Sequence, residues 1–311
     1  MTSPVQNLAP VGSTTRPATW KLLLAFGIIY FVLAIRIGVR EVPPFLLAAI
    51  RFIVAGMVLF AWMRLKGTPM PTRREWASAA VVAVPIFVLD YGLVFWAERR
   101  VPSGITAVMM AMISLFMALS EIIFLRTQRL TMRLSFALLV GLCGVAVLVS
   151  RSLGLAEEPI NPYGAIALLI GASSWAIAAI LLRKLPLPAS KPMSSAAQML
   201  IGGVWLAILS TMLGEFRGFD VWAVSRGAWL ALAYLIVAGS IIAYTAYVWL
   251  LHHESPTKVG TYAYVNPVVA VAIGYFLGGE AVGPRTLLGS LLVLVSVVVI
   301  TTTRRKAVVS G

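Results

Sequence analysis

The chain has 311 residues, of which 60% are hydrophobic and only 12% are charged, and its mean hydropathy is +0.94. Soluble globular domains carry about 25% charged residues, so this composition excludes a water-soluble protein and indicates an integral membrane protein. The net charge of +14 does not predict nucleic-acid binding, because the Lys and Arg residues lie in short clusters between apolar runs.

Apolar runs along the chain predict ten transmembrane helices. A helix needs roughly 20 apolar residues to cross the hydrocarbon layer, and these runs lack the alternation of barrel strands. The expected fold is therefore an all-α integral membrane protein with short connections. The expected spans are 20–39, 45–63, 75–96, 103–125, 134–149, 163–182, 194–213, 229–251, 257–277 and 286–302.

The second half of the chain repeats the first. Three aromatic residues around the third span recur 153 positions later in the eighth: Trp76, Tyr91 and Trp96 become Trp229, Tyr244 and Trp249. Arg51 and Gly56 of the second span match Gln198 and Gly203 of the seventh at an offset of 147. Spans one to five are thus repeated as spans six to ten.

A five-span unit begins its second copy on the opposite side of the membrane, so the two copies are expected to be inverted. Inverted repeats around a midplane site are the architecture of secondary transporters, although channels and enlarged bundles also arise by duplication. The expected organisation is a flexible tail (1–19), a first repeat (20–150), a second repeat (160–303) and a second tail (304–311).

Charge bias predicts the orientation. The side of the N-terminus carries 16 Lys and Arg residues and the other side carries 8, so both termini are expected in the cytoplasm. The pair Arg99–Arg100 opposes this bias. The polar first residues predict a tail and not a signal peptide. The expected location is therefore the cytoplasmic (inner) membrane, with several crossings.

Ionisable residues inside spans are costly and mark candidate sites. Arg51 is interpreted as a fixed cation for a substrate carboxylate, and its repeat mate Gln198 as a hydrogen-bonding counterpart. An internal ion pair between Arg51 and Asp90 remains an equal alternative. Asp90 is also a candidate proton carrier, whereas Glu121 is expected to face solvent at a helix end.

Deep aromatic residues form the second set of candidates. Tyr30, Tyr91, Trp175, Tyr244 and Tyr264 fall far from the span ends, where a phenol or an indole N–H needs a partner. They are expected to line a cavity for an apolar or aromatic solute, with simple packing as the alternative.

Two predicted spans contain an internal proline, and the sequence lacks several common enzyme motifs. Pro85 in the third span and Asn266–Pro267 in the ninth interrupt helical hydrogen bonding, which is tolerated beside a cavity or a neighbouring helix. The chain has no phosphate-binding GxxxxGK[ST], no HExxH and no GxSxG motif. An enzyme is therefore not expected, and neither a cofactor nor a metal is.

Four motifs together resemble a known family. AIRIGVREVPPFLLAAIRFIVAG and YGLVFWAERRVPSG in the first half, with SSWAIAAILLRKLPLP and YVNPVVAVAIGYFLGGE in the second, resemble the ten-helix, two-repeat EamA-type branch of the drug/metabolite transporter superfamily. The resemblance implies a secondary transporter, often an exporter of amino acids or other metabolites, with a central cavity between the halves. The matching positions are Arg51, Tyr91, Trp96, Trp175, Gln198, Asn266, Pro267 and Glu280.

Departures from the family pattern lie in the first and fourth spans, at 28–32, Ser114, Thr127 and Gln128. The predicted function is export of small organic metabolites, aromatic or neutral amino acids first, by alternating access. A passive solute channel and a drug- or nucleoside-type exporter of the same fold are the alternatives. The expected partners are a small-molecule substrate and the lipid bilayer, and a monomer and a homodimer both fit. The candidate binding residues are Tyr30, Arg51, Asp90, Tyr91, Trp175, Gln198, Tyr244, Tyr264 and Asn266.

Overall fold

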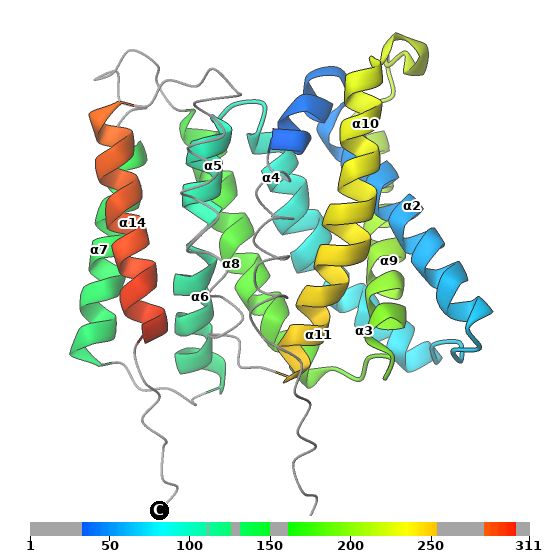
Figure 1. Cartoon of the computed structure of the whole chain (residues 1–311), viewed down its shortest axis with the longest axis horizontal. Coiled ribbons are helices and arrows are strands. Elements are labelled where there is room, and N and C mark those ends of the chain that lie inside the picture. Colours follow the sequence, from blue (N-terminus) through cyan, green and yellow to red (C-terminus); the bar gives the residue numbers. More distant parts are fainter. Residues whose placement is uncertain (1–32, 111, 126–130, 150–160, 254–282, 303–311) are drawn as a thin grey trace, which may run out of the picture.

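The computed structural model describes residues 33–110, 112–125, 131–149, 161–253 and 283–302, and these form helices joined by turns and short loops (Figure 1). Five helical stretches in them are long and apolar enough to cross a membrane. These are Pro44–Leu65, Arg73–Ala97, Pro162–Lys184, Lys191–Met212 and Arg226–Leu251. The described part of the chain is thus built of packed, membrane-length helices, as predicted.

The described helix boundaries lie within a few residues of the predicted spans, while the predicted span 257–277 and most of 20–39 lie outside the described residues. Residues 33–41 form the described end of the first helix. The single helices that follow are α2 (Pro44–Leu65), α5 (Ser103–Met110), α6 (Ile113–Ser120), η2 (Glu121–Leu125), α7 (Met132–Val149), α8 (Pro162–Lys184), α9 (Lys191–Met212), the short turn η4 (Val221–Ala223) and α14 (Pro284–Thr302). Two composite rods are α3 (Arg73–Ala83), η1 (Val84–Tyr91) and α4 (Gly92–Ala97), and α10 (Arg226–Tyr234), η5 (Leu235–Tyr244) and α11 (Thr245–His253).

Local sequence explains where several helices begin. Proline stands at or next to the first position of α2, α8 and α9, where its missing N–H costs least. Thr72 and Glu75 form a capping box at the start of α3. Asn161 and Ser225 accept backbone N–H groups at the starts of α8 and α10.

Each composite rod contains a wide π-helical segment, at matching places in the two halves of the chain. The segment η1 ends at Tyr91 and η5 ends at Tyr244, the tyrosines separated by 153 residues. Pro85 near the start of η1 removes a backbone donor, which explains the first segment. The second has no proline. π-Helical turns are rare and occur frequently at functional sites.

Helices α2 and α9 pack closely through glycine. A Cβ on Gly56 would lie 2.9 Å from the backbone N of Leu200, and a Cβ on Gly203 would lie 2.8 Å from the backbone N of Ile53. At the offset of 147, Gly56 matches Gly203 and Ile53 matches Leu200, so the two contacts are reciprocal. Residue numbers rise along α2 as they fall along α9, which makes this pair antiparallel. Small residues permit such backbone approach between membrane helices.

Helices α7 and α14 repeat this arrangement at the other end of the molecule (Figure 1). A Cβ on Gly144 would lie 2.8 Å from the backbone N of Val293, and one on Gly141 would lie 2.6 Å from Ser296 Oγ. At the offset of 152 that relates Arg133 to Arg285, Gly141 matches Val293 and Gly144 matches Ser296. This pair is therefore also antiparallel, and its two contacts are reciprocal. Reciprocal contacts are expected when a local twofold axis relates the two helices.

Two carboxylates join the two halves at one end of the bundle. Glu215, after α9, accepts the backbone N–H groups of Phe45 and Leu46 at 3.3 and 2.9 Å and so caps α2. Glu41, the last residue of the first helix, accepts the Ser225 backbone N–H and hydroxyl at 2.6 and 2.7 Å. Both place negative charge at a helix N-terminus, where the helix dipole favours it.

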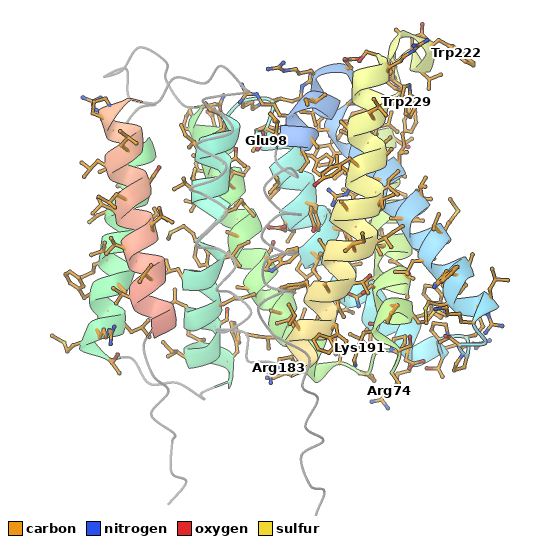
Figure 2. All side chains as sticks on the ribbon, in the orientation of Figure 1. Arg74, Glu98, Arg183, Lys191, Trp222 and Trp229 are labelled. Atoms are coloured by element: carbon orange, nitrogen blue, oxygen red, sulfur yellow. The ribbon has the colours of Figure 1, made fainter. Side chains whose placement is uncertain are left out.

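The charged residues labelled in Figure 2 lie at the two ends of the bundle. Figure 2 shows Arg74, Arg183 and Lys191 at one end, while Glu98 and Trp229 lie at the other. The three basic residues all belong to the side that was assigned to the cytoplasm from the Lys and Arg bias.

Substituting Gly203 with alanine is expected to destabilise the protein, because the new methyl group would meet the backbone of α2 and not a flexible side chain. Overpacking of this kind costs roughly 1–3 kcal/mol. Gly56→Ala should cost a similar amount, since the contact is reciprocal. Thermal unfolding in detergent measures both. Gly227→Ala is the control, because a Cβ there meets only Ser225 Oγ at 3.6 Å. A Gly203→Ala protein as stable as the control would contradict this packing.

The Glu41 contact is expected to depend on pH. The N–H and hydroxyl of Ser225 lower the pKa of the Glu41 carboxyl below its ordinary value of 4.5. The contact is therefore present at neutral pH and is lost on acidification through the lowered pKa. Amide hydrogen exchange in the first turn of α10 should be faster in Glu41→Gln than in the wild type at neutral pH. The difference should vanish in acid, and a pH-independent difference would exclude the ionised form as the cause.

Candidate functional site

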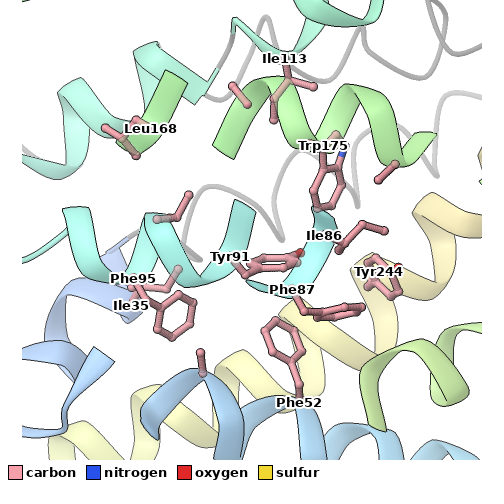
Figure 3. Close-up of a cluster of buried hydrophobic side chains, with 14 of the residues drawn as sticks. Ile35, Phe52, Ile86, Phe87, Tyr91, Phe95, Ile113, Leu168, Trp175 and Tyr244 are labelled. Atoms are coloured by element: carbon pink, nitrogen blue, oxygen red, sulfur yellow. The ribbon is translucent and has the colours of Figure 1, made fainter. Parts of the chain in front are cut away.

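An aromatic cluster occupies the middle of the bundle, where both π-helical segments meet α2 and α8. Figure 3 shows Phe52, Phe87, Tyr91, Trp175 and Tyr244 turned toward one another. The Phe52 ring lies 4.7 Å from Phe87 and 4.8 Å from Tyr91, between centroids. The cluster also includes Tyr247, whose centroid is 4.8 Å from that of Trp175. It therefore draws rings from both halves of the chain.

The two repeat-related tyrosines share this cluster. Phe87 lies 5.9 Å from Tyr91 and 5.4 Å from Tyr244, and Trp175 lies 5.6 and 6.5 Å from the same two rings. Phe87 and Trp175 thus bridge Tyr91 and Tyr244. Separations of 4.5–7 Å are those at which aromatic pairs attract through their edges and faces.

Arg51 stands beside the cluster and is fully buried. Its Nε donates to Ser240 Oγ at 2.8 Å, which links α2 in the first half to η5 in the second. Its guanidinium carbon lies 4.6 Å from the Phe52 centroid, 5.1 Å from that of Tyr91 and 5.8 Å from that of Phe95. Aromatic faces at these distances stabilise a cation, so the rings help to hold the charge inside the bundle.

Gln198, the repeat mate of Arg51, is equally buried and touches the other tyrosine. The Tyr244 hydroxyl donates to Gln198 Oε1 at 2.7 Å, and Gln198 Nε2 donates to Ser194 Oγ at 2.8 Å. The positions are therefore used in the same way twice. Arg51 meets Tyr91 in the first half, and Gln198 meets Tyr244 in the second.

Asp90 points elsewhere, although it precedes Tyr91. Its side chain is 2% exposed, and a Cβ on Gly171 of α8 would lie 3.4 Å from Asp90 Oδ1. Successive helical residues point roughly 100° apart, so a Tyr91 directed toward Arg51 leaves Asp90 directed toward α8. The alternative of an Arg51–Asp90 ion pair is accordingly wrong for these two described residues.

Small residues of α8 and α9 create the room that the π segment η1 needs. A Cβ on Gly202 would lie 2.3 Å from Phe87 Cγ, so the Phe87 ring occupies the space of a missing side chain. Ser174 Oγ lies 2.9 Å from the Pro85 carbonyl oxygen and 2.7 Å from that of Gly171. A neighbouring helix thus supplies a donor to the irregular backbone, as expected for an interruption inside a membrane.

The structure brings together five of the predicted site residues: Arg51, Tyr91, Trp175, Gln198 and Tyr244. It turns Asp90 toward α8, and Tyr30, Tyr264 and Asn266 lie outside the described residues. Sequence reasoning missed Ser240, Phe87 and Tyr247. A lone serine in the apolar run 235–244 was the only available signal for Ser240, and its role depends on how α2 packs against η5.

Replacing Ser240 with alanine is expected to destabilise the protein by about 1.5–3 kcal/mol, because a buried guanidinium loses a hydrogen bond. Thermal unfolding in detergent measures the loss. Ser195→Ala is the matched control, since Ser195 Oγ is equally buried but has no hydrogen-bond partner within the described part of the chain. Equal stability of the two variants would show that the Arg51–Ser240 bond contributes nothing.

Known proteins agree with this architecture. The model of the EamA-like transporter family matches residues 15–150 and again 162–302, which indicates a duplicated unit. An uncharacterized inner membrane transporter of Escherichia coli K12, YedA, is 38% identical over 91% of this chain and 89% of its own. An uncharacterized transporter of Archaeoglobus fulgidus is 24% identical over 89% and 95%, and the protein PecM of Dickeya dadantii 26% over 83% and 82%.

A solved crystal structure shares the fold, with a TM-score of 0.65 and 22% identity over 94% of this chain and 99% of the other. The family model covers nearly the whole chain, and an identity of 38% with YedA over most of both sequences indicates common descent. The chain therefore belongs to the EamA-like transporter family of the drug/metabolite transporter superfamily, and it is a multi-pass membrane transporter and not an enzyme.

Proposed function

We propose that this chain is a secondary transporter that exports small organic metabolites, with aromatic or neutral amino acids as the first solute class. The proposed mechanism is alternating access between two inverted five-helix halves, with the solute held at the aromatic cluster. Both termini face the cytoplasm, and the membrane is the inner membrane, the location that the name of YedA gives for that relative.

Inverted topology is supported by the reciprocal, antiparallel contacts of α2 with α9 and of α7 with α14. In both pairs a helix of the first half meets its own repeat mate. A twofold axis in the membrane plane relates halves in this way in many secondary transporters. Rocking of one half against the other about these glycine contacts would open the centre of the bundle alternately to each side.

One observation carries the assignment of the site. Arg51 beside Tyr91 and Gln198 beside Tyr244 form equivalent pairs at the junction of the two halves. One pair carries a fixed cation and the other a neutral amide. A solute with one anionic end and one neutral or apolar end matches this arrangement, because a guanidinium can grip a carboxylate with two hydrogen bonds.

The aromatic rings supply the remaining recognition. Tyr91, Trp175 and Tyr244 present edges and faces from both halves, so an apolar solute side chain would contact both at once. Such a solute would stabilise the closed arrangement in which the rings meet. Tyr30, Tyr264 and Asn266 remain predicted contacts from outside the described residues, and the solute carboxylate would replace Ser240 as a partner of Arg51.

Counterflow into proteoliposomes tests the function. Vesicles loaded with an unlabelled amino acid should accumulate the labelled form of the same amino acid transiently, because a carrier exchanges solute through one alternating site. A panel of amino acids identifies the preferred one. Flux that neither saturates nor shows counterflow would indicate a passive channel and refute alternating access.

Arg51→Gln is expected to weaken discrimination between an amino acid and its carboxamide by about tenfold, equivalent to about 1.4 kcal/mol. The reason is that only the carboxylate forms a charge-assisted pair with the guanidinium. Competition of the two compounds in counterflow measures the ratio. Arg64→Gln is the control, because Arg64 is exposed and its Nη1 donates to the carbonyl oxygen of Thr68 in its own helix end. Unchanged discrimination in Arg51→Gln would remove Arg51 from the site.

A further inference from the structure

Asp90 is a buried acid that the proposed solute site does not use. It lies in the π-helical segment η1 and is 2% exposed. Its Oδ1 has no hydrogen-bond partner, and the carboxyl makes no ion pair, within the described part of the chain. Its Oδ1 faces helix α8, where a Cβ on Gly171 would lie 3.4 Å away.

The groups around Asp90 offer little to compensate a negative charge. Gly171, Ser174 and Trp175 of α8 contact η1 here. The Ser174 hydroxyl is directed to backbone carbonyls. Gly202 of α9 faces Phe87 on the same segment. The ionisable groups nearest in the cluster are Tyr91 and Tyr244, both uncharged phenols when protonated, and Arg51, which is directed to Ser240.

Arg51 of α2 is buried near η1, with its guanidinium carbon 5.1 Å from the Tyr91 centroid. The other charged groups on the described helices packed against η1 lie at the helix ends. In α3 they stand in the first turn, in α8 in the last turn and in α9 at the first residue. These are Arg73, Arg74, Glu75, Arg183, Lys184 and Lys191. The rod that contains η1 continues through α4, which has no charged side chain, to Glu98. Within the described part of the chain, an ionised Asp90 would thus sit inside the bundle without an ion-pair partner, an arrangement that proteins avoid.

We propose that Asp90 carries a proton that is exchanged during solute transport. In the arrangement seen here, with the side chain of Asp90 2% exposed, the carboxyl group holds the proton as a neutral acid. When one half moves and water reaches η1, the acid releases the proton to that water and becomes a carboxylate, which takes up a proton from the opposite side in the next half-cycle. This inference rests on the proposed transport function, because it adds the coupling ion to the same alternating cycle.

Only the first repeat carries a carboxyl group at the position of Asp90. The mate of Asp90 at the offset of 153 is Ala243, so the second half has no carboxyl group at this position. Asp90 and Tyr91 are adjacent in η1, so a movement of the rings around a solute displaces the segment that carries the acid. Solute binding and proton binding would then be linked through one short stretch of helix.

Infrared spectroscopy of the protein in lipid tests the protonation directly and needs no solute. The wild type should show the carbonyl-stretching band of a protonated carboxylic acid at neutral pH, and Asp90→Asn should lack it. Asp220→Asn, which removes an exposed carboxyl in the loop before α10, is the matched control and should retain the band. Identical spectra of wild type and Asp90→Asn would overturn the proposal.

Proton flux in proteoliposomes tests the coupling. Vesicles that enclose a pH-sensitive dye should change internal pH when an amino acid that shows counterflow is added outside. Asp90→Asn should lose this proton movement while its remaining solute flux stays saturable. Gly171→Ala keeps the carboxyl and adds a methyl group at an ordinary contact distance of 3.4 Å, so it should keep the proton movement.

The outcomes separate this inference from the transport function. Saturable counterflow in the wild type without any pH change would overturn proton coupling and leave the transporter intact. Absence of counterflow for every solute would refute the proposed function itself. A Gly171→Ala protein that loses proton movement as Asp90→Asn does would show that packing against α8, and not the proton, underlies the effect.

Discussion

The close antiparallel contact of α2 with α9 is the constraint on which the centre of this protein depends. Gly56 of α2 packs against Leu200 of α9, and Gly203 of α9 packs against Ile53 of α2. The second contact is the repeat equivalent of the first, so the two backbones approach each other at two matching points. Arg51 lies five residues before Gly56, and Gln198 lies five before Gly203. A reciprocal helix pair therefore carries its two polar side chains to equivalent places near the middle of the bundle. Wider side chains at the crossing would separate both polar groups from their tyrosines.

Irregular helix geometry then sets which side chains meet these polar groups. The π-helical segments η1 and η5 end at Tyr91 and Tyr244, and both tyrosines enter the same cluster. An extra residue in a helical turn changes the rotation of the following residues about the helix axis. It therefore determines which side chains of the rod point toward the cluster. Ser174 supplies a donor to the carbonyl of Pro85 on one side of η1, and Gly202 leaves space for Phe87 on the other. The glycines and serines of the neighbouring helices thus make room for the irregular turn and satisfy its backbone.

The sequence predicted the described spans to within a few residues because apolar length is fixed by the bilayer, and it predicted the repeat because aromatic residues recur at constant spacing. Five of the nine residues predicted for the site, Arg51, Tyr91, Trp175, Gln198 and Tyr244, lie close together, since matched positions in related halves fall near a common axis. Its failures concern rotation about helix axes. The π segment η5 has no proline to reveal it, and the partnership of Ser240 with Arg51 and the direction of Asp90 both depend on the turn geometry of η1 and η5. The caps formed by Glu41 and Glu215 depend on loops that approach helices some 170 to 184 residues away.

The proposed coupled transport depends on a symmetric frame that carries asymmetric chemistry. If both halves carried the same polar groups, the two ends of a solute would be recognised alike, and a site for a coupling ion would appear twice. Here the frame repeats, with glycine contacts, π segments and tyrosines in both halves, while charge appears once. Arg51 faces Gln198 across the repeat, and Asp90 corresponds to Ala243. Asp90 forms no ion pair with Arg51, so the two groups do not neutralise each other. In the proposed cycle the guanidinium would bind an anionic group of the solute and the carboxyl group would carry a proton, and Tyr91 would link the two.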